Sequence, residues 1–208
     1  MKRILLTGFE PFLKFKENPT MQVVEALDGK VFNGYDIYGR IMKVDFNESS
    51  KQFKAYIDEV QPDIIISLGS AAGRFKITPE RIAINIKDGE ADNNGFAPVD
   101  EKIHEDSADA YFTNLPIRRM VERLKKVGYP AEISNTAGTY LCNNIMYEGL
   151  AYAKQQENVL AGFIHIPASF ELAIQNGKIP GWNVRDLIAG VAFCIEETVN
   201  FANISEMV

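Results

Sequence analysis

The residues of this chain with the clearest capacity for nucleophilic chemistry are its two cysteines and two histidines. Cys142 follows a turn-rich segment, residues 136–139, and precedes a helix predicted over about residues 140–155. Cys142 is therefore expected in the first turn of that helix, where free backbone N–H groups and the helix dipole favour an anion. The thiolate is the nucleophilic form of cysteine, and the same N–H groups can stabilise an oxyanion. The alternative is a buried cysteine that packs as a small hydrophobic side chain.

His165 lies near the end of an apolar strand predicted over residues 160–166, with its side chain opposite to those of Ile164 and Ile166. A histidine there can serve as a general base if it reaches the proton of the nucleophile within about 3 Å or through a water. The alternative is a core histidine with satisfied hydrogen bonds. The other histidine, His104, follows a polar stretch beside Glu105 and is expected to be a solvated surface residue.

Glu80 precedes a strictly alternating segment, residues 81–86, which predicts a strand with its isoleucines on one face. In thiol hydrolases a carboxylate can orient the histidine and stabilise the imidazolium as the third member of a triad. The alternative for Glu80 is a solvated side chain at the start of a strand.

The elements that must position these residues alternate between strand-like and helix-like segments. Strands are predicted at residues 3–8, 36–44, 63–69, 81–86, 131–135 and 160–166, and helices at 18–27, 48–60, 116–126, 140–155 and 183–201. This alternation predicts one α/β domain over residues 1–208, a three-layer α/β/α sandwich around a mixed, largely parallel sheet. Ligands of such sheets bind at the carboxyl ends of the strands. The turns at 69–74, 135–142 and 165–167 are expected at that edge.

Two further segments belong to the same predicted edge. The glycine-rich turn Gly69 to Arg74 matches neither a dinucleotide-binding nor a P-loop pattern. It is read as a strand-exit turn in which Arg74 binds a carboxylate or pairs structurally. Phe9 and Phe12 bracket Glu10 and Pro11 after the first strand, and they either line an apolar pocket or belong to the core.

Composition excludes several classes of protein. The net charge of −6 is spread without a basic run, so no nucleic-acid or anionic-membrane partner is expected. No apolar stretch reaches the roughly 18 residues that span a bilayer, and the opening residues lack the pattern of a signal peptide. Two cysteines form no disulfide framework, so a reduced cytoplasmic location is expected.

Five blocks occur in an order that resembles the pyroglutamyl peptidase I (pyrrolidone-carboxylate peptidase) family. They are T-G-F-E-P-F with N-P-T, P-D-I-I-I-S-L-G-S-A-A-G-R, I-T-P-E-R-I-A-I-N, S-N-T-A-G-T-Y-L-C-N-N and G-F-I-H-I-P. Each block alone is weakly specific, but five in order form a specific signal from about residue 4 to residue 167.

The resemblance implies a cysteine peptidase that removes an N-terminal pyroglutamyl residue from peptides, with Cys142, His165 and Glu80 as its triad. It implies substrate contacts for a set of pocket residues, with Asn85 nearby: Phe9, Phe12, Asn18, Leu141, Ser70 and Arg74. It also implies no metal or cofactor, a peptide substrate and a homodimer or homotetramer.

The chain departs from the family pattern at four places near the substrate loops: Leu13 with Lys14, Ser70, Glu90 in a shortened loop, and Ala168. These departures keep open a thiol amidohydrolase of the same fold that acts on another small amide. A third hypothesis is a non-enzymatic α/β ligand-binding module, which rests only on the turn at Gly69.

Overall fold

A six-stranded sheet forms the centre of the protein, whose computed structural model describes residues 1–12 and 15–205. The strand order is β2-β3-β1-β4-β8-β5, and the four inner strands are parallel. The two edge strands, β2 and β5, run antiparallel to their neighbours. The strands are β1 (Lys2–Phe9), β2 (Val31–Phe32), β3 (Tyr35–Met42), β4 (Ile64–Ser70), β5 (Thr78–Pro79) and β8 (Leu160–Ile166).

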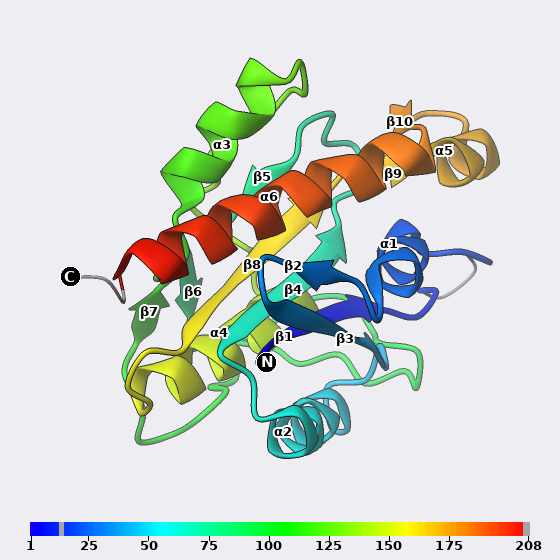
Figure 1. Cartoon of the computed structure of the whole chain (residues 1–208). Coiled ribbons are helices and arrows are strands. Elements are labelled where there is room, and N and C mark those ends of the chain that lie inside the picture. The colour runs from blue at the N-terminus through cyan, green and yellow to red at the C-terminus, as the bar shows by residue number, and fades with distance from the viewer. Residues whose placement is uncertain (13–14, 206–208) are drawn as a thin grey trace.

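Helices cover both faces of this sheet (Figure 1). One face carries α1 (Pro19–Leu27), α3 (Ile117–Lys126) and α6 (Val184–Ser205). The other face carries α2 (Ser49–Val60) and α4 (Leu141–Lys154). The predicted three-layer α/β/α architecture with a mixed, mostly parallel sheet is therefore confirmed.

Each inner strand is apolar on both sides because it is buried between two helical layers. In β1, Ile4 and Leu6 face α1 and α6, whereas Leu5 between them faces α2 and α4. β4 repeats the division, with Ile66 on the first side and Ile65 on the second. These continuous apolar runs explain why the strands were recognisable from the sequence.

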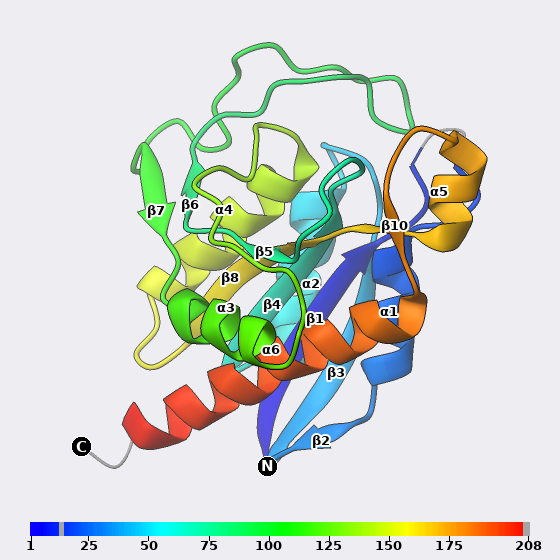
Figure 2. The ribbon, with the colours of Figure 1, turned by 90° about the horizontal axis from the view of Figure 1, so that it is seen from above.

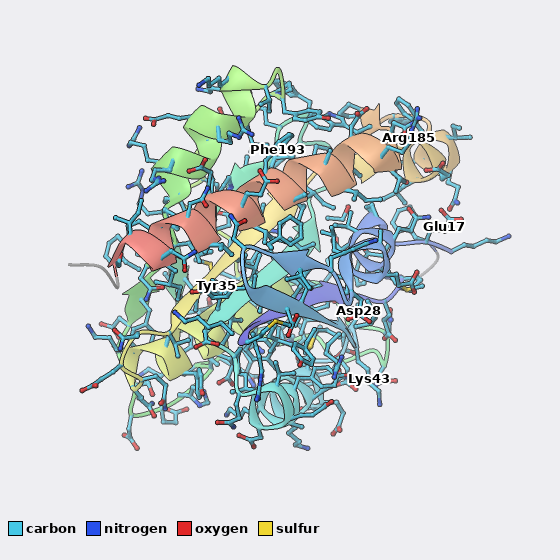
Figure 3. The ribbon with its side chains drawn as sticks, viewed as in Figure 1. Glu17, Asp28, Tyr35, Lys43, Arg185 and Phe193 are labelled. Atoms are coloured by element: carbon cyan, nitrogen blue, oxygen red, sulfur yellow. The ribbon has the colours of Figure 1, made fainter. Side chains whose placement is uncertain are left out.

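The last helix, α6, is long and apolar enough by length and composition to cross a membrane. Leu187, Val191 and Ile195 on this helix are fully buried in the core on the face of the sheet that carries α1, α3 and α6. Its Phe193 faces α3, where the Arg123 guanidinium lies 4.8 Å from the ring centroid (Figure 3). The apolar character of α6 is accounted for by packing against the sheet and α3.

Shorter elements and a long loop lie outside the central sheet. They are the antiparallel pair β6 (Ile82–Ile84) and β7 (Ala110–Phe112), the parallel pair β9 (Ala168–Ser169) and β10 (Gly181–Trp182), and α5 (Phe170–Asn176). Residues 85–109 between β6 and β7 form the long loop, which arches over one end of the molecule (Figure 2).

Some predicted elements differ from those observed. The strand expected at residues 131–135 is wrong, because the segment makes only two isolated parallel bridges, Ile77 with Ala131 and Glu80 with Ser134. The strand expected at 81–86 is shortened to β6 and belongs to a separate two-stranded sheet. The short helix α5 was not predicted, since its seven residues are too few for a clear helical period.

Helix α4 is anchored by the residue after Cys142. The Asn143 side chain accepts the Ile84 N–H at 2.9 Å and donates to the carbonyls of Ile84 and Ile86 at 2.8 and 2.9 Å. Asn143 is 1 % exposed, so these hydrogen bonds lie out of water. The anchor fixes the N-terminal turn of α4 against the loop that follows β6.

We expect Asn143→Ala to lower the free energy of unfolding by about 3 kcal/mol, because it removes the hydrogen bonds to the backbone groups of Ile84 and Ile86. Urea unfolding measures the change. Gln156→Ala, at an exposed position just after the same helix, is the control and should change stability by less than about 0.5 kcal/mol. Equal stability of the two variants would contradict this anchoring role.

Candidate active site

The structure brings Cys142, His165 and Glu80 together at the carboxyl ends of the strands. His165 lies near the end of β8, and its Nδ1 is 2.7 Å from Oε1 of Glu80. The pairing of β5 with β8 places Thr78 opposite His165, and the Glu80 N–H donates to the Phe163 carbonyl at 2.9 Å. The side chains of His165 and Cys142 are also hydrogen-bonded. Two strands and one helix thus align the three groups in the order Cys–His–Glu.

Cys142 is the second residue of α4, and the N-cap Tyr140 makes no side-chain cap to the first turn. The first-turn N–H groups of a helix have no intrahelical partners, so they remain available to an anion beside the thiol. The predicted position of Cys142 at a helix N-terminus is therefore observed.

Gly69 at the end of β4 makes room for the thiol. A Cβ at this position would lie 2.8 Å from Cys142 Sγ and 2.8 Å from the ring of Phe163. Contacts shorter than 3.0 Å are essentially never seen for real Cβ atoms. Position 69 must lack a side chain if the sulfur is to occupy its observed place.

The environment of His165 sets its protonation. Burial alone lowers the pKa, but the charge and hydrogen bond of Cys142, together with those of Glu80, outweigh burial and raise the pKa of His165 from 6.5 to about 9. The ring is therefore an imidazolium at neutral pH. Its Nδ1 is committed to Glu80, which leaves Nε2 for Cys142.

Glu80 is completely buried, and one of its oxygens makes both of its strong contacts. Oε1 accepts from His165 and also from Arg74 Nη1 at 2.8 Å. Oε2 is buried without a hydrogen-bond partner among the described residues. The alternative of a solvated Glu80 is excluded by its burial.

A cavity of about 310 Å³ opens beside Cys142. Its walls are mostly apolar and include six of the predicted site residues. The lining residues are Phe9, Phe12, Phe15, Glu17, Asn18, Pro19, Val44, Ser70, Ala72, Tyr140, Leu141, Cys142 and Leu172. The cavity reaches Cys142 from the side of β1 and α1.

Three predicted pocket residues differ in the polar groups that they leave free. The Asn18 side chain caps α1 by accepting from Thr20 N–H at 3.1 Å and donates to the Glu10 carbonyl at 3.1 Å. Ser70 Oγ is buried and has no partner among the described residues. Leu141 is 1 % exposed and contributes apolar surface.

Arg74 and Asn85 lie outside the cavity lining. Arg74 donates to Thr78 Oγ1 and Glu80, both at 2.8 Å, so its role here is structural pairing. The Asn85 side chain accepts the N–H groups of Ile103 and His104 and thereby shapes the long loop. The partners of these two side chains could not be predicted from the sequence, because they depend on how the strands and loops are arranged.

The other histidine and cysteine have environments of their own. The expectation that His104 is solvated is wrong, because its side chain is one-third exposed and its Nε2 lies 3.0 Å from Oε2 of the buried Glu148. Both cysteines are free, and Cys194 is fully buried on α6. Burial, and then the charge of Glu197, raise the pKa of Cys194 to about 12.

The departures from the family pattern fall in different places. Leu13 and Lys14 lie outside the described residues. Ser70 lines the cavity, Ala168 is fully buried in β9, and Glu90 is exposed in the long loop. Only Ser70 of the three described positions is part of the cavity wall.

Several lining residues were not predicted. Tyr140 packs edge-on against Phe12 and Phe46, and its hydroxyl donates to the Ala91 carbonyl at 3.3 Å. Burial, and then the charge of Asp92, raise the pKa of Tyr140, which keeps that hydroxyl protonated. Its place immediately before Leu141 was the available signal.

Glu17 lies two residues before α1 (Figure 3). It also lines the cavity, with a buried Oε2 that has no partner among the described residues. Nothing in its sequence context marked this residue.

A polar network holds the long loop beside this cavity. Asp92, 1 % exposed, accepts the N–H groups of Phe46, Asn94 and Phe96 at 2.9–3.0 Å. Asn93 Nδ2 reaches the Pro11 carbonyl at 3.1 Å and Glu10 Oε1 at 3.3 Å. The loop after β6 and the segment after β1 therefore support each other at the cavity mouth.

Within the described residues, no group of three or more His, Cys, Asp or Glu side chains is arranged to hold a metal ion. The site offers a thiol, an imidazole, a carboxylate and an apolar cavity. Together with the α/β/α fold, these groups define the class of thiol hydrolases.

Comparison with known proteins agrees with this class. Residues 2–201 match the pyroglutamyl peptidase family. The chain is 72% identical to the pyrrolidone-carboxylate peptidase of Lysinibacillus sphaericus over 203 residues, which cover 98% of this chain and 100% of the relative. It is 50% identical to that of Oceanobacillus iheyensis over 196 residues, covering 94% and 98% of the two chains.

Solved structures give the same result. The pyrrolidone carboxyl peptidase from Thermococcus litoralis superposes with a TM-score of 0.94 at 37% identity, covering 99% of this chain and 96% of that one. A mutant pyrrolidone carboxyl peptidase from Pyrococcus furiosus gives 0.92 at 36% identity, covering 95% and 98%. This chain belongs to the pyroglutamyl peptidase family and is a cysteine-type hydrolase.

Replacing Gly69 tests the packing around the thiol. We expect Gly69→Ala to lower kcat/KM for a pyroglutamyl anilide about 100-fold, because the new methyl group must displace Cys142 Sγ or the Phe163 ring. Steady-state kinetics measures the change.

Gly149→Ala on α4 is the matched control, since its Cβ would make only ordinary contacts, at 3.4 Å or more, with Phe53 and Ile65. That variant should keep near wild-type kcat/KM. The account of Gly69 is contradicted if both variants are equally active while folded.

Proposed function

We propose that this protein hydrolyses the N-terminal pyroglutamyl residue of peptides through a thioester on Cys142, with His165 and Glu80 completing the triad. The single observation that carries the proposal is the placement of the His165 imidazole between Glu80 and Cys142. Its Nδ1 lies 2.7 Å from Glu80, and the same ring is hydrogen-bonded to Cys142, which lines the cavity. A buried base that is oriented on one side and faces a thiol on the other is the arrangement that nucleophilic acyl transfer requires.

The first half-reaction forms the thioester. The Cys142 thiolate attacks the pyroglutamyl carbonyl carbon, and the resulting oxyanion is stabilised by N–H groups in the first turn of α4. The protonated His165 donates its Nε2 proton to the amide nitrogen. The C–N bond then breaks and releases the shortened peptide with a free amino terminus.

The second half-reaction restores the enzyme. Neutral His165 removes a proton from a water molecule, which attacks the thioester carbonyl. The C–S bond breaks, pyroglutamic acid leaves, and Cys142 and His165 return to the thiolate–imidazolium pair. Glu80 keeps the imidazole in the same orientation through both halves and stabilises its charge.

The cavity supports a pyroglutamyl ring as the group that is recognised. A five-membered lactam carries no charged amine, so an apolar pocket with few polar groups suits it. Phe9, Phe12 and Tyr140 offer ring faces and edges. Ser70 Oγ, which has no partner among the described residues, can hydrogen-bond with the lactam amide. Asn18 contributes by fixing the N-terminus of α1 at the wall.

A thiol amidohydrolase that prefers another small amide is the alternative, motivated by Ser70 in the cavity wall. Turnover of pyroglutamyl, prolyl and glutaminyl anilides separates the two. Pyroglutamyl preference by a factor of about 100 supports the proposal, since a site built for one hydrogen-bonding group rejects analogues strongly. Preference for either other anilide overturns it. The family assignment excludes a non-enzymatic module.

We also propose that residues 1–208 form one catalytic domain that acts in the cytoplasm as a homodimer or homotetramer on free peptides. Two free cysteines, one of them buried in the core, support a reducing compartment. Light scattering at several protein concentrations tests the assembly, and a monomer at all of them would overturn it.

Removal of the thiol is the direct test of the nucleophile. Cys142→Ala and Cys142→Ser should each lower kcat for a pyroglutamyl fluorogenic amide by at least about 10⁴-fold, because no thioester forms. Cys194→Ala is the control and should retain turnover, since Cys194 lies in the helical layer of α6. Comparable activity of the Cys142 variants and the wild type would contradict the mechanism.

The pH profile tests Glu80. Glu80 raises the pKa of His165, so Glu80→Gln should move the alkaline limb of kcat/KM to lower pH by about one unit. The sign follows because removing an anion beside an imidazolium favours loss of its proton. A Glu80→Gln profile with an unmoved alkaline limb would show that Glu80 does not act on His165.

A further inference from the structure

Arg74 adds a fourth charged side chain to the row formed by Cys142, His165 and Glu80, because it contacts Glu80. It lies in the turn after β4, where its N–H donates to the Ala71 carbonyl at 3.0 Å. One guanidinium nitrogen, Nη1, donates to Thr78 Oγ1 and to Glu80 Oε1, both at 2.8 Å. Thr78 is the residue that β5 places opposite His165. Arg74 is therefore tied to the strand pair that positions the triad.

The contact matters because Glu80 is buried. Its side chain is 0% exposed, Oε2 has no partner among the described residues, and Oε1 is shared between Arg74 and His165. A buried carboxylate is costly unless it is paired and hydrogen-bonded. The Arg74 side chain is 36% exposed, so it joins this buried anion to the solvent-facing surface.

We propose that Arg74 is a positioning residue of the triad, which holds the Glu80 carboxylate against His165 and offsets its buried charge. The inference rests on the triad proposed above. The charges then alternate along one line: Cys142 thiolate, His165 imidazolium, Glu80 carboxylate, Arg74 guanidinium. The line as a whole is neutral in its active protonation state.

The other charged groups near this line are engaged elsewhere. Arg81, next to Glu80 in the chain, donates from Nε to Asn135 Oδ1 at 2.7 Å. Lys76 on the Arg74 side pairs with Glu132 at 2.5 Å. For His165, the charged groups that act on it among the described residues are Cys142 and Glu80. Arg74 is thus the cation whose charge reaches the triad through Glu80.

The sign of the effect follows from the charge count. Without Arg74 the active form carries one net negative charge, so every proton in the line is held more tightly. The acid limb of the activity profile, where the Cys142–His165 pair takes up a proton, moves to higher pH. The alkaline limb, where the imidazolium loses its proton, moves the same way. Removal of Glu80 shifts the alkaline limb in the opposite direction.

The experiment compares Arg74→Met and Arg74→Lys with wild type, measuring kcat/KM for a pyroglutamyl amide and iodoacetamide alkylation of Cys142 from pH 5 to 10. Arg74→Met should move both limbs up by about one unit and lower kcat/KM at least tenfold. Arg74→Lys keeps the charge and should leave both limbs within a few tenths of a pH unit of their wild-type positions. Arg119→Met, whose guanidinium pairs with Glu197 on α6, is the matched control and should leave the profile unchanged.

A double variant shows whether Arg74 acts through Glu80. In a Glu80→Gln background, Arg74→Met should produce less than half of the shift that it produces alone, because coupled residues are not additive. Limbs that stay in place, or move down, in folded Arg74→Met would overturn the inference.

The pH dependence of iodoacetamide alkylation reports the protonation of the Cys142–His165 pair and needs no peptide substrate. If wild type failed to hydrolyse pyroglutamyl amides yet Arg74→Met shifted the alkylation profile upward, the proposed substrate would fail and the role of Arg74 would stand.

Discussion

The site depends on the hydrogen bond between His165 and Glu80, 2.7 Å long and buried on both sides. It exists because β5 reverses direction and pairs antiparallel with β8, which brings a residue 85 positions away to the histidine. Other contacts serve this geometry or the thiol beside it. Among them, Gly69 leaves space for the sulfur and Asn143 anchors the helix that carries it. A substitution at the β5–β8 edge would therefore disturb catalysis more than it disturbs the rest of the fold.

The fold and the site obey different physical requirements. The sheet is held by apolar side chains on both faces, and its stability rests on burial. The site instead concentrates charges at the carboxyl ends of the strands, where a buried imidazole and a buried carboxylate are tolerable because each has an opposite charge beside it. The apolar cavity next to Cys142 lowers the local dielectric and strengthens these interactions. The same burial that costs free energy makes the charges effective.

Much of the fold was predictable from the sequence because strong local patterns carry it. The apolar runs at β1, β4 and β8 and the helical periods of α2 and α6 mark the layers without knowledge of contacts. Residues with special chemistry, Cys142 and His165, stood out by type and by their place at the ends of elements. Contacts between separate segments were not accessible, since they require knowledge of how the strands, helices and loops are arranged. The partner of Arg74, the bond from His104 to Glu148 and the cavity contribution of Glu17 are of this kind.

The account's central claim is that His165 is held as an imidazolium between Cys142 and Glu80. Titration of the histidine ring ¹⁵N resonances by NMR measures this directly, with His104→Gln used to assign the only other histidine. The account predicts that His165 keeps both ring protons through neutral pH and loses one near pH 9. Titration of His165 close to the ordinary value of about 6.5 would contradict it.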